Sequence, residues 1–517
     1  MSVRLVWFKR DLRTQDHAAL ARAAQLGPVL CLYIIEPSVW QSPDSSQRQF
    51  IFLRQCLRDL YRQLQSLGAR LHVVTGEVVE VLERLHHALP LAEIYSHQET
   101  GNALTYARDL AVAGWCRAHQ IAWHECRQHG VIRALSGRNQ WNRQWAALMD
   151  SQQETLVSLK TVDLPWAAES WPAWESWQRA EDQPPQMQTG GRSAGLAVLQ
   201  SFLDQRSSSY RGGISSPLSA PTACSRLSPY LSWGCLGMRE VVQATAQKLE
   251  QLPSKSRAAK GLVGFLSRLH WHCHFIQKLE SEPEIEWCNM HRGYDGLREG
   301  EWNQEHFLAL TQNRTGWPLV DACVVMLRET GWLNFRMRAM LVSVAAYPLW
   351  LHWKPVGDWL ATQFVDYEPG IHWSQMQMQS GTTGINTTRV YNPIKQARDH
   401  DPDGRFVRQW LPILRKVPDS WLFEPWKMPA EVQRHCGVMV GERRGLGEGE
   451  SIWPMPPVDL DQATRVAKSR LHARRAEPDV RAAKNDIVER HGSRAGPRSR
   501  TVSRKAAQTV AQTSFEF

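Results

Sequence analysis

The sequence predicts an α/β plus all-α protein, in which a doubly wound parallel sheet is joined by a long linker to a helical part. Three observations predict this fold class. Short apolar runs alternate with longer amphipathic stretches over the first 130 residues, a segment rich in Trp and Pro follows, and helical periodicity then continues to about residue 427. A chain of 517 residues is also too long for one hydrophobic core.

The apolar runs of the first part have the length of strands, and the segments between them are long enough for crossover helices. The predicted strands are Val3–Phe8, Val29–Ile35, Leu71–Val74, Ala92–Tyr95 and Ile121–His124. The predicted helices between them are Gln47–Leu67, Val78–Leu89 and Ala103–His119. No GxGxxG motif follows the first run, so the usual dinucleotide-binding signature is absent.

The rest of the chain divides by composition. We predict an α/β domain over 1–130, an interdomain linker over 131–192, a helical domain over 193–427, an extension over 428–462 and a basic, disordered tail over 463–517. The linker is expected to lie across the surface through Trp166, Trp171, Trp174 and Trp177. The predicted helices of the helical domain are Ala194–Gln205, Pro229–Leu249, Arg257–Leu279, Pro318–Glu329, Asn334–Tyr347 and Val356–Phe364.

Charge is concentrated in the tail. Residues 463–517 hold 13 Lys and Arg against 5 Asp and Glu, which accounts for most of the net charge of +10. Such an arm could neutralise phosphates, or it could be a solvated tail without a partner.

Composition also excludes several classes of protein. The longest apolar run, Met340–Trp353, contains Pro348 and is too short to cross a bilayer, and charges from Lys9 onward leave no room for a signal peptide. Ten cysteines lie without any CxxC pair, which argues against a disulfide framework or a four-thiolate metal site. We expect a cytoplasmic, monomeric protein without a metal site.

Two short segments could bind or react with a ligand. Ser228 before Pro229 predicts a helix start with Ser228 as N-cap. At that end, the hydroxyl of Ser225 and the guanidinium of Arg226 would favour an anion such as a diphosphate. The alternative is a capped helix that binds no ligand. His270 and His274 share a helix face and could be two metal ligands, although no third ligand is evident and a packing role is favoured.

Five motifs, in this order, resemble the photolyase and cryptochrome flavoprotein family, and are closest to those of deoxyribodipyrimidine photolyases. They are VWFKRDLR from Val6, SRLSPYLSWG from Ser225, TGWPLVDA from Thr315, TGWLNFRMR from Thr330 and YNPIKQARDHDPDGRFVRQWLP from Tyr391. The resemblance covers residues 1 to about 427 and leaves the tail outside.

The resemblance implies a Rossmann-like domain with room for an antenna chromophore of the folate or deazaflavin type, and a helical domain that holds a folded FAD. It implies an FAD-dependent carbon–carbon lyase: excited reduced flavin gives an electron to a flipped-out pyrimidine dimer in DNA, the cyclobutane ring splits and the electron returns. The protein would have to fix flavin and lesion within electron-transfer range.

The resemblance also implies roles for individual residues. The FAD contacts would be Tyr210, Ser225, Arg226, Leu227, Ser228, Arg338, Asp366, Tyr367 and Glu368. The DNA contacts would be Arg268, Trp271, Arg336 and Gln396, with Trp271 stacking on the lesion. The residues tied to the photochemistry would be Trp271, Trp353 and His372, the last near flavin N5.

This sequence departs from the family pattern at several of these positions. Arg268 stands where a lesion-contacting glutamate is usual, and Phe335 replaces an asparagine. Of the usual tryptophan relay only Trp353 remains, while Leu310 and Met376 take the other two places, so photoreduction must be slow or use another route such as Trp373.

Two rivals to repair stay open, and the departures at Arg268, Phe335 and the loop after Asp366 support the first. One is a cryptochrome-type blue-light photoreceptor without repair activity. The other, ranked far behind, is a metal-dependent hydrolase built on His270 and His274.

Overall fold

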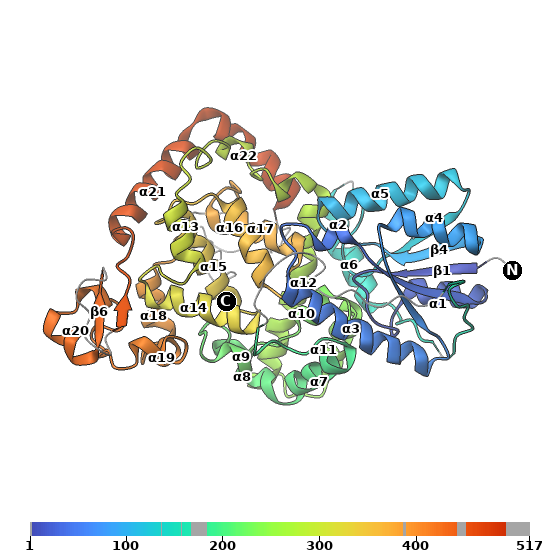
Figure 1. The fold of residues 1–517 in the computed structure, drawn as a ribbon, viewed down its shortest axis with the longest axis horizontal. Coiled ribbons are helices and arrows are strands. Elements are labelled where there is room, and N and C mark those ends of the chain that lie inside the picture. The colour runs from blue at the N-terminus through green and yellow to red at the C-terminus, as the bar shows by residue number, and fades with distance from the viewer. Residues whose placement is uncertain are drawn as a thin grey trace.

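The computed structural model describes residues 3–135, 137–156, 158–166, 184–385, 389–441 and 451–492 of the chain. A parallel sheet with its covering helices lies on the right of Figure 1, and a larger helical part lies on the left. The predicted fold class is therefore confirmed.

The sheet has five parallel strands in the order β3-β2-β1-β4-β5. They are β1 (Val3–Phe8), β2 (Val29–Ile35), β3 (Leu71–Thr75), β4 (Leu91–His97) and β5 (Ala122–Cys126). Val6 of the central strand pairs with Cys31 on one side and with Tyr95 on the other. Each predicted apolar run contributes one strand, because a strand covered by helices on both faces needs an almost continuous apolar sequence.

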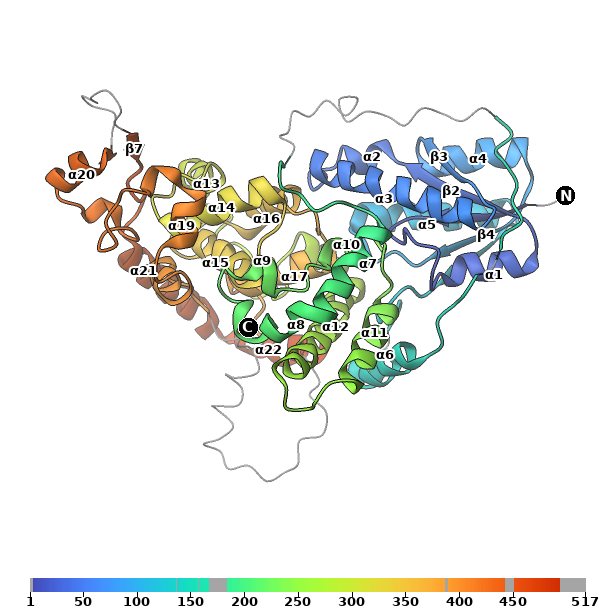
Figure 2. The same ribbon diagram turned by 90° about the horizontal axis from the view of Figure 1, so that it is seen from below.

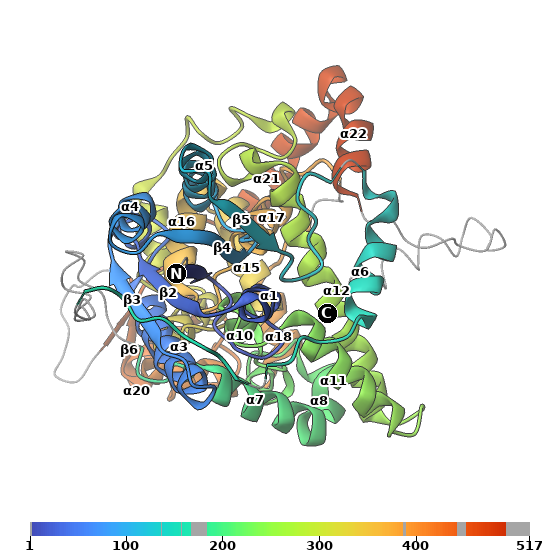
Figure 3. The same ribbon diagram turned by 90° about the vertical axis from the view of Figure 1, so that its right-hand side faces the viewer.

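Helices cover both faces of the sheet (Figure 3). Alternate side chains of β1 point to opposite faces, so Val6 and Phe8 join one core while Leu5 and Trp7 join the other. The first core includes α1 (Ala18–Leu26) and α3 (Gln47–Ser66), and the second includes α4 (Val78–Ala88) and α5 (Ala103–Ala118). The short helix α2 (Pro37–Trp40) follows β2.

The carboxyl end of β1 is held by a buried trio of Asp11, His17 and His97. Both imidazoles reach the same Asp11 oxygen, His17 Nε2 at 3.0 Å and His97 Nδ1 at 2.8 Å. Their atoms lie close enough together to hold a metal ion. However, His17 Nδ1 accepts the Leu20 N–H, and His97 Nδ1 is hydrogen-bonded to Asp11. The trio therefore acts as a hydrogen-bonded brace for the loop after β1.

The segment between the two parts contains its own helical structure. The 3₁₀ turn η1 (Arg138–Gln140) and α6 (Trp141–Asp150) lie inside the predicted linker. Trp166 packs beneath the Arg84 guanidinium, whose carbon lies 4.3 Å from the ring centroid. Trp171, Trp174 and Trp177 fall outside the described residues.

The helical part is built around α12 (Arg257–Ser281), which packs against α8 (Ser207–Gly213) and α17 (Pro369–Ser380). Its other helices before residue 364 are α7 (Arg192–Ser201), the π turn η3 (Phe202–Arg206), α9 (Ala220–Ala223), α10 (Ser228–Ser232), α11 (Met238–Glu250), α13 (Gln304–Thr311), α14 (Pro318–Thr330), α15 (Phe335–Ala346) and α16 (Trp353–Gln363). Two 3₁₀ turns, η4 (Pro283–Glu286) and η5 (Arg292–Tyr294), follow α12.

The predicted helix Pro229–Leu249 is wrong, because it is broken into α10 and α11. Gly234 stands between them with φ of 63°, and a Cβ there would lie 2.1 Å from the backbone oxygen of Arg10. Only glycine allows the N-terminal loop to approach this closely. Ser228 is also not an N-cap: it is the first residue of α10, Leu227 takes the cap position, and no side chain caps that end.

The C-terminal region contains more helix than expected. Its elements are α18 (Pro393–His400), α19 (Arg405–Trp410), η6 (Pro412–Leu414), η7 (Pro425–Lys427), α20 (Ala430–Cys436), the strand pair β6 (Val438–Val440) and β7 (Ser451–Trp453), α21 (Leu460–Ala476) and α22 (Pro478–His491). In Figure 2, α20 and β7 lie at the end far from the sheet, whereas α22 returns to α12, where His491 lies 2.7 Å from Glu282.

The prediction of a disordered tail is wrong for residues 463–491. Ala467, Leu471 and Val480 form a small core with Tyr294 and Tyr347. These apolar residues are too sparse to give a clear periodicity, but an existing surface supplies the rest of the core. Residues 493–517 fall outside the described residues.

Within the described residues, no helix combines the length and the apolar character that crossing a bilayer requires.

Candidate functional site

A large cavity opens in the helical part between α10, α12, α15 and α17. Its empty volume is about 1550 Å³, open mouth included. Of the predicted FAD contacts, the ones that line it are Tyr210, Ser225, Arg226, Ser228, Arg338, Asp366, Tyr367 and Glu368. The cavity therefore gathers residues from segments more than 150 positions apart.

The loop before α10 presents a cation to the cavity. Arg226 has φ of 64°, an uncommon conformation for a non-glycine residue that turns the chain sharply. Its guanidinium carbon lies 3.7 Å from the ring centroid of Trp332, and burial lowers the pKa of Arg226 to about 10. Ser225 and Ser228 line the cavity beside it. This group of hydroxyls and one cation suits an anion, as expected from the sequence.

An ion pair crosses the cavity wall between α15 and the loop before α17. Arg338 Nη2 lies 2.8 Å from Asp366 Oδ2, and Arg338 Nε donates to the Leu333 carbonyl over 2.6 Å. The guanidinium also lies 4.0 Å from the ring centroid of Phe364. Asp366 Oδ1 is buried and has no hydrogen-bond partner among the described residues. A ligand in the cavity could supply the missing donor.

The two residues after Asp366 connect the cavity to the α/β part. The Tyr367 hydroxyl donates to Asp44 over 2.8 Å, and the Tyr367 carbonyl accepts from Arg10 over 2.6 Å. Glu368 is half-buried, and loss of hydration raises its pKa to about 7. Its Oε1 has no partner among the described residues. The loop thus holds one anchored residue and one carboxyl group that can exchange a proton near neutral pH.

The predicted DNA-contacting residues line the same cavity on other elements. Trp271 and Arg268 lie one turn apart on α12, and Arg336 lies in the first turn of α15. Trp271 is stacked on Phe275 at 5.6 Å and meets His274 edge-on at 4.9 Å. An aromatic face and two guanidinium groups therefore border one cavity, as a site for an extrahelical base requires.

His372 also lines the cavity. Its Nε2 donates to the Gly357 carbonyl over 2.9 Å, so in the neutral ring Nδ1 carries the lone pair. Burial lowers the pKa of His372 to about 4, which keeps the ring neutral at physiological pH. The residue can accept a hydrogen bond from a ligand but cannot supply a positive charge.

Three predicted residues lie outside the cavity lining: Leu227, Trp353 and Gln396. Leu227 is a core residue. Trp353 is buried behind Trp373, with ring centroids 6.0 Å apart, and Trp373 in turn lies 4.8 Å from His372. Gln396 is on α18, the helix that ends at His400. Burial is the main cause that lowers the pKa of His400, and the nearby charge of Arg336 is the second.

The histidine pair of α12 is engaged in other contacts. His270 Nε2 lies 3.1 Å from Asn142 Oδ1, and His274 Nδ1 lies 3.2 Å from Arg138 Nη1. Among the described residues, neither belongs to a group of three possible metal ligands. These contacts do not support the metal-dependent hydrolase.

Sequence reasoning missed part of the lining. Asn334, Phe275, Ile371, Gln375 and Gln379 face the same cavity. The helix that carries the last three, α17, was not predicted, because its Gln and Met residues give no clear apolar period. The glutamines would have been found only by placing α17 against α12.

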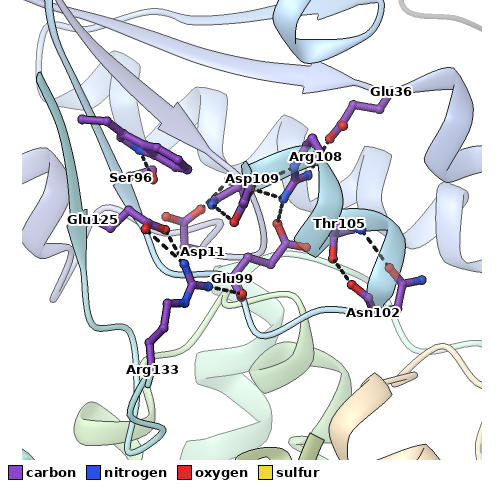
Figure 4. A network of polar contacts seen from close by, with 12 residues as sticks. Asp11, Glu36, Ser96, Glu99, Asn102, Thr105, Arg108, Asp109, Glu125 and Arg133 are labelled. Carbon is purple, nitrogen blue, oxygen red and sulfur yellow. Dashed lines mark hydrogen bonds and ion pairs between the residues drawn. The ribbon is translucent and has the colours of Figure 1, made fainter. Parts of the chain in front are cut away.

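A second cleft lies at the carboxyl edge of the sheet, where ligands bind in open α/β sheets. Its lining includes Trp40 and Trp233, whose ring planes differ by 4° and whose ring centroids lie 6.3 Å apart. Tyr367 lines this cleft and also borders the first cavity. Arg108 occupies its wall, 2.7 Å from Glu36 and 2.5 Å from Glu99 (Figure 4). The cleft combines aromatic faces with an ordered set of charges.

The first cavity fits FAD by its chemistry. Arg226 with its neighbouring hydroxyls would receive the diphosphate, and the unpartnered oxygens of Asp366 and Glu368 offer acceptors to ring or sugar donors. Trp271 lines the same cavity.

Two family models match the chain. One, described as DNA photolyase, matches residues 4–141, and the other, described as the FAD binding domain of DNA photolyase, matches residues 265–473. Together they cover the sheet part and most of the helical part, including α15, α17 and α12 from residue 265 onward.

Similar proteins include both photolyases and cryptochromes. Cryptochrome DASH of Gloeobacter violaceus is 28% identical over 497 residues, which cover 91% of this chain and 95% of that one. The deoxyribodipyrimidine photo-lyase of Vibrio cholerae is 27% identical over 459 residues, 83% of this chain and 94% of that one.

Solved structures show the same fold. A bacterial class III photolyase from Agrobacterium tumefaciens has a TM-score of 0.77 at 24% identity, covering 92% of this chain and 98% of that one. An archaeal photolyase from Sulfolobus tokodaii with two FAD molecules has a TM-score of 0.72 at 23% identity, covering 91% of this chain and all of that one (100%). From these matches and the cavity, the chain belongs to the DNA photolyase and cryptochrome family and carries its FAD-binding domain.

Proposed function

We propose that this protein repairs pyrimidine dimers in DNA with light, as an FAD-dependent carbon–carbon lyase. The observation that carries the proposal is that one cavity contains both the Arg338 and Asp366 pair and the face of Trp271. A cofactor and an extrahelical lesion could therefore lie in contact. Bound FAD would supply light-driven one-electron chemistry.

The residues of the cavity would contribute position and electrostatics. Arg226, Ser225 and Ser228 bind the diphosphate, while Arg338 and Asp366 fix the ring system at one edge. His372 stays neutral and accepts a hydrogen bond through Nδ1. The apolar walls of Phe364 and Val342 exclude water from the reacting rings.

DNA would bind at the mouth of this cavity. Arg268 and Arg336 are placed to contact phosphates or base edges, and Trp271 to stack on the flipped bases. Gln396 lies on α18, is only 9% exposed and does not line the cavity, so its contact with DNA stays a prediction from the family resemblance. Arg268 replaces the acidic lesion contact that the family resemblance implies, so this protein would bond carbonyl oxygens of the lesion instead of N–H groups.

The test is a repair assay with two substrates. Purified protein loaded with FAD and reduced is mixed with an oligonucleotide that holds one cyclobutane dimer or one six-four product. Blue light should remove one lesion with turnover, and the dark reaction should leave both intact. Bound FAD without loss of either lesion would contradict the proposal.

A blue-light photoreceptor is the second candidate. Tyr367 borders the cavity, and its hydroxyl and carbonyl bond to Asp44 and Arg10 of the α/β part. A change at the cavity could thus reach the other domain. Light-dependent changes in protease sensitivity near residues 36–46, without repair, would favour this candidate.

We further propose that the cleft at the sheet edge holds a second chromophore of the folate or deazaflavin type. The parallel rings of Trp40 and Trp233 offer a stacking surface there. Extraction of the purified holoprotein, followed by chromatography, should yield this second chromophore beside FAD. FAD alone, even after incubation with both candidates, would contradict the assignment.

A further inference from the structure

Three glutamines of α17 differ in how their amides are satisfied. Gln377 is fully buried: its Oε1 accepts from Met290 N over 2.6 Å, and its Nε2 donates to the carbonyls of Ile285 and Cys288 over 2.8 and 2.6 Å. That glutamine ties α17 to the loop after α12. It shows how a structural amide in this helix is satisfied.

Gln375 and Gln379 lie one turn apart on the side of the same helix that lines the cavity. Gln379 Nε2 donates to Gln375 Oε1 over 3.1 Å. The remaining atoms, Gln375 Nε2 and Gln379 Oε1, are buried and have no hydrogen-bond partner among the described residues. Gln379 is only 3% exposed. Leaving such atoms unsatisfied is costly, so a partner from the cavity is expected.

The mutual hydrogen bond fixes what the pair offers. The Gln375 NH2 group and the Gln379 carbonyl oxygen remain without a hydrogen bond among the described residues, so the pair offers an amide donor group and a carbonyl acceptor. If both amides were rotated by 180°, donor and acceptor would exchange places, but one of each would still remain. The pair is poorly suited to a phosphate, because its acceptor oxygen would repel the anion. It matches a ring edge that carries an N–H next to a carbonyl oxygen or ring nitrogen.

We infer that Gln375 and Gln379 are specificity-determining residues that bind such a ring edge of the cofactor. The inference rests on FAD binding in this cavity. FAD has two edges of this chemistry: the isoalloxazine edge with N3–H and C4=O, and the adenine edge with its 6-amino group and N1. On the same helix, Met376 has no hydrogen-bonding amide, and His372 has its N–H bonded to Gly357.

The experiment measures FAD affinity of the refolded, cofactor-free full chain by fluorescence quenching. The variants are Gln375→Met and Gln379→Met, which keep side-chain length and remove the amide. Gln65→Met, at an exposed site on α3, is the control. Each cavity variant should bind FAD at least about tenfold more weakly, with the control unchanged. Unchanged affinity in both cavity variants would overturn the inference.

Two ligand analogues locate the edge and need no substitution in the protein. FAD methylated at N3 tests the isoalloxazine edge, and FAD lacking the adenine 6-amino group tests the adenine edge. The wild-type chain should bind one analogue about tenfold more weakly than FAD, and the corresponding Met variants should lose that preference. Equal binding of FAD and both analogues would overturn the inference, because the partner would then be a sugar hydroxyl.

Failure of the proposed function gives a different result. A wild-type chain that binds no FAD at all would refute the cofactor site itself, whereas normal FAD binding with insensitive variants refutes only the role of the glutamines. A carbonyl stretching band of bound flavin that shifts in Gln375→Met or Gln379→Met would support the isoalloxazine edge independently of repair activity.

Discussion

Arg338 Nη2 and Asp366 Oδ2 lie 2.8 Å apart, and this pair joins α15 to the loop that leads into α17. The Asp366 side chain is only 3% exposed and that of Arg338 is 24% exposed. Removing either partner would leave a charge in a mostly dry wall of the cavity.

Arg338→Met should therefore lower the free energy of unfolding of the cofactor-free chain by about 3 kcal/mol. Urea denaturation measures the change. Lys395→Met removes the exposed ion pair with Asp399 and is the matched control, expected to cost no more than about 0.5 kcal/mol. Similar small losses in the two variants would show that the Arg338 pair adds little.

Glu368 should make stability depend on pH. Burial raises its pKa from 4.5 to about 7, so losing the proton costs more in the folded chain than in the unfolded chain. Stability of the cofactor-free protein should fall as pH rises from about 4.5 to about 7 and then level off.

The variant Glu368→Gln removes this decline. Between pH 5 and pH 8 the wild type should lose about 2 kcal/mol more stability than the variant, measured by denaturant unfolding at both pH values. Glu431→Gln, an exposed substitution, should behave like the wild type. Parallel pH profiles for wild type and Glu368→Gln would mean that the carboxyl group titrates normally.

Trp271→Ala should weaken binding of dimer-containing DNA by about tenfold or more while FAD binding is unchanged, because stacking on a flipped base is removed. A gel-shift titration measures it. Trp287, 47% exposed and outside the cavity lining, gives the control Trp287→Ala. If the Trp271 variant bound damaged DNA as tightly as the wild-type protein, Trp271 would not belong to the lesion site.

Trp373 is the expected electron donor for photoreduction. It lies between His372 at the cavity wall and Trp353, with ring centroids 4.8 and 6.0 Å away, whereas Leu310 and Met376 cannot be oxidised readily. One electron would pass from Trp373 to the flavin and be replaced through Trp353 by an added thiol.

Trp373→Phe should slow light-driven reduction of bound FAD at least about tenfold. The rate of reduction is measured as the decrease of flavin absorbance in the presence of the thiol. Trp410→Phe on α19 is the control. An unchanged rate in the Trp373 variant would place the electron route elsewhere.

Residues 493–517 carry five Lys and Arg against one acidic residue. A chain that ends at residue 492 keeps α21 and α22, and its affinity for DNA should depend less on salt. The slope of the logarithm of the binding constant against the logarithm of the salt concentration should be smaller by about 0.9 for each phosphate that the segment neutralises. An identical slope would show that this segment does not bind DNA. Deleting all of 463–517 is unsuitable, since Ala467, Leu471 and Val480 complete a core with Tyr347.

The sequence alone determined the sheet and most of the long helices. Val29–Ile35 is apolar throughout, and Val3–Phe8 is apolar except for Arg4, because both faces of a parallel sheet are covered; local composition is enough to show this. The motifs around Arg226 and Arg338 also indicated the family, because they resemble its pattern and occur in the same order along the chain.

Only the tertiary structure decided how these parts meet. The break at Gly234 depends on the approach of Arg10, and the order of α21 depends on a surface made by Tyr294 and Tyr347, neither of which is encoded nearby in the chain. Likewise, the unsatisfied amide atoms of Gln375 and Gln379 become meaningful only when α17 is placed against the cavity. Contacts between distant segments follow from packing of the whole chain, so local periodicity could not reveal them.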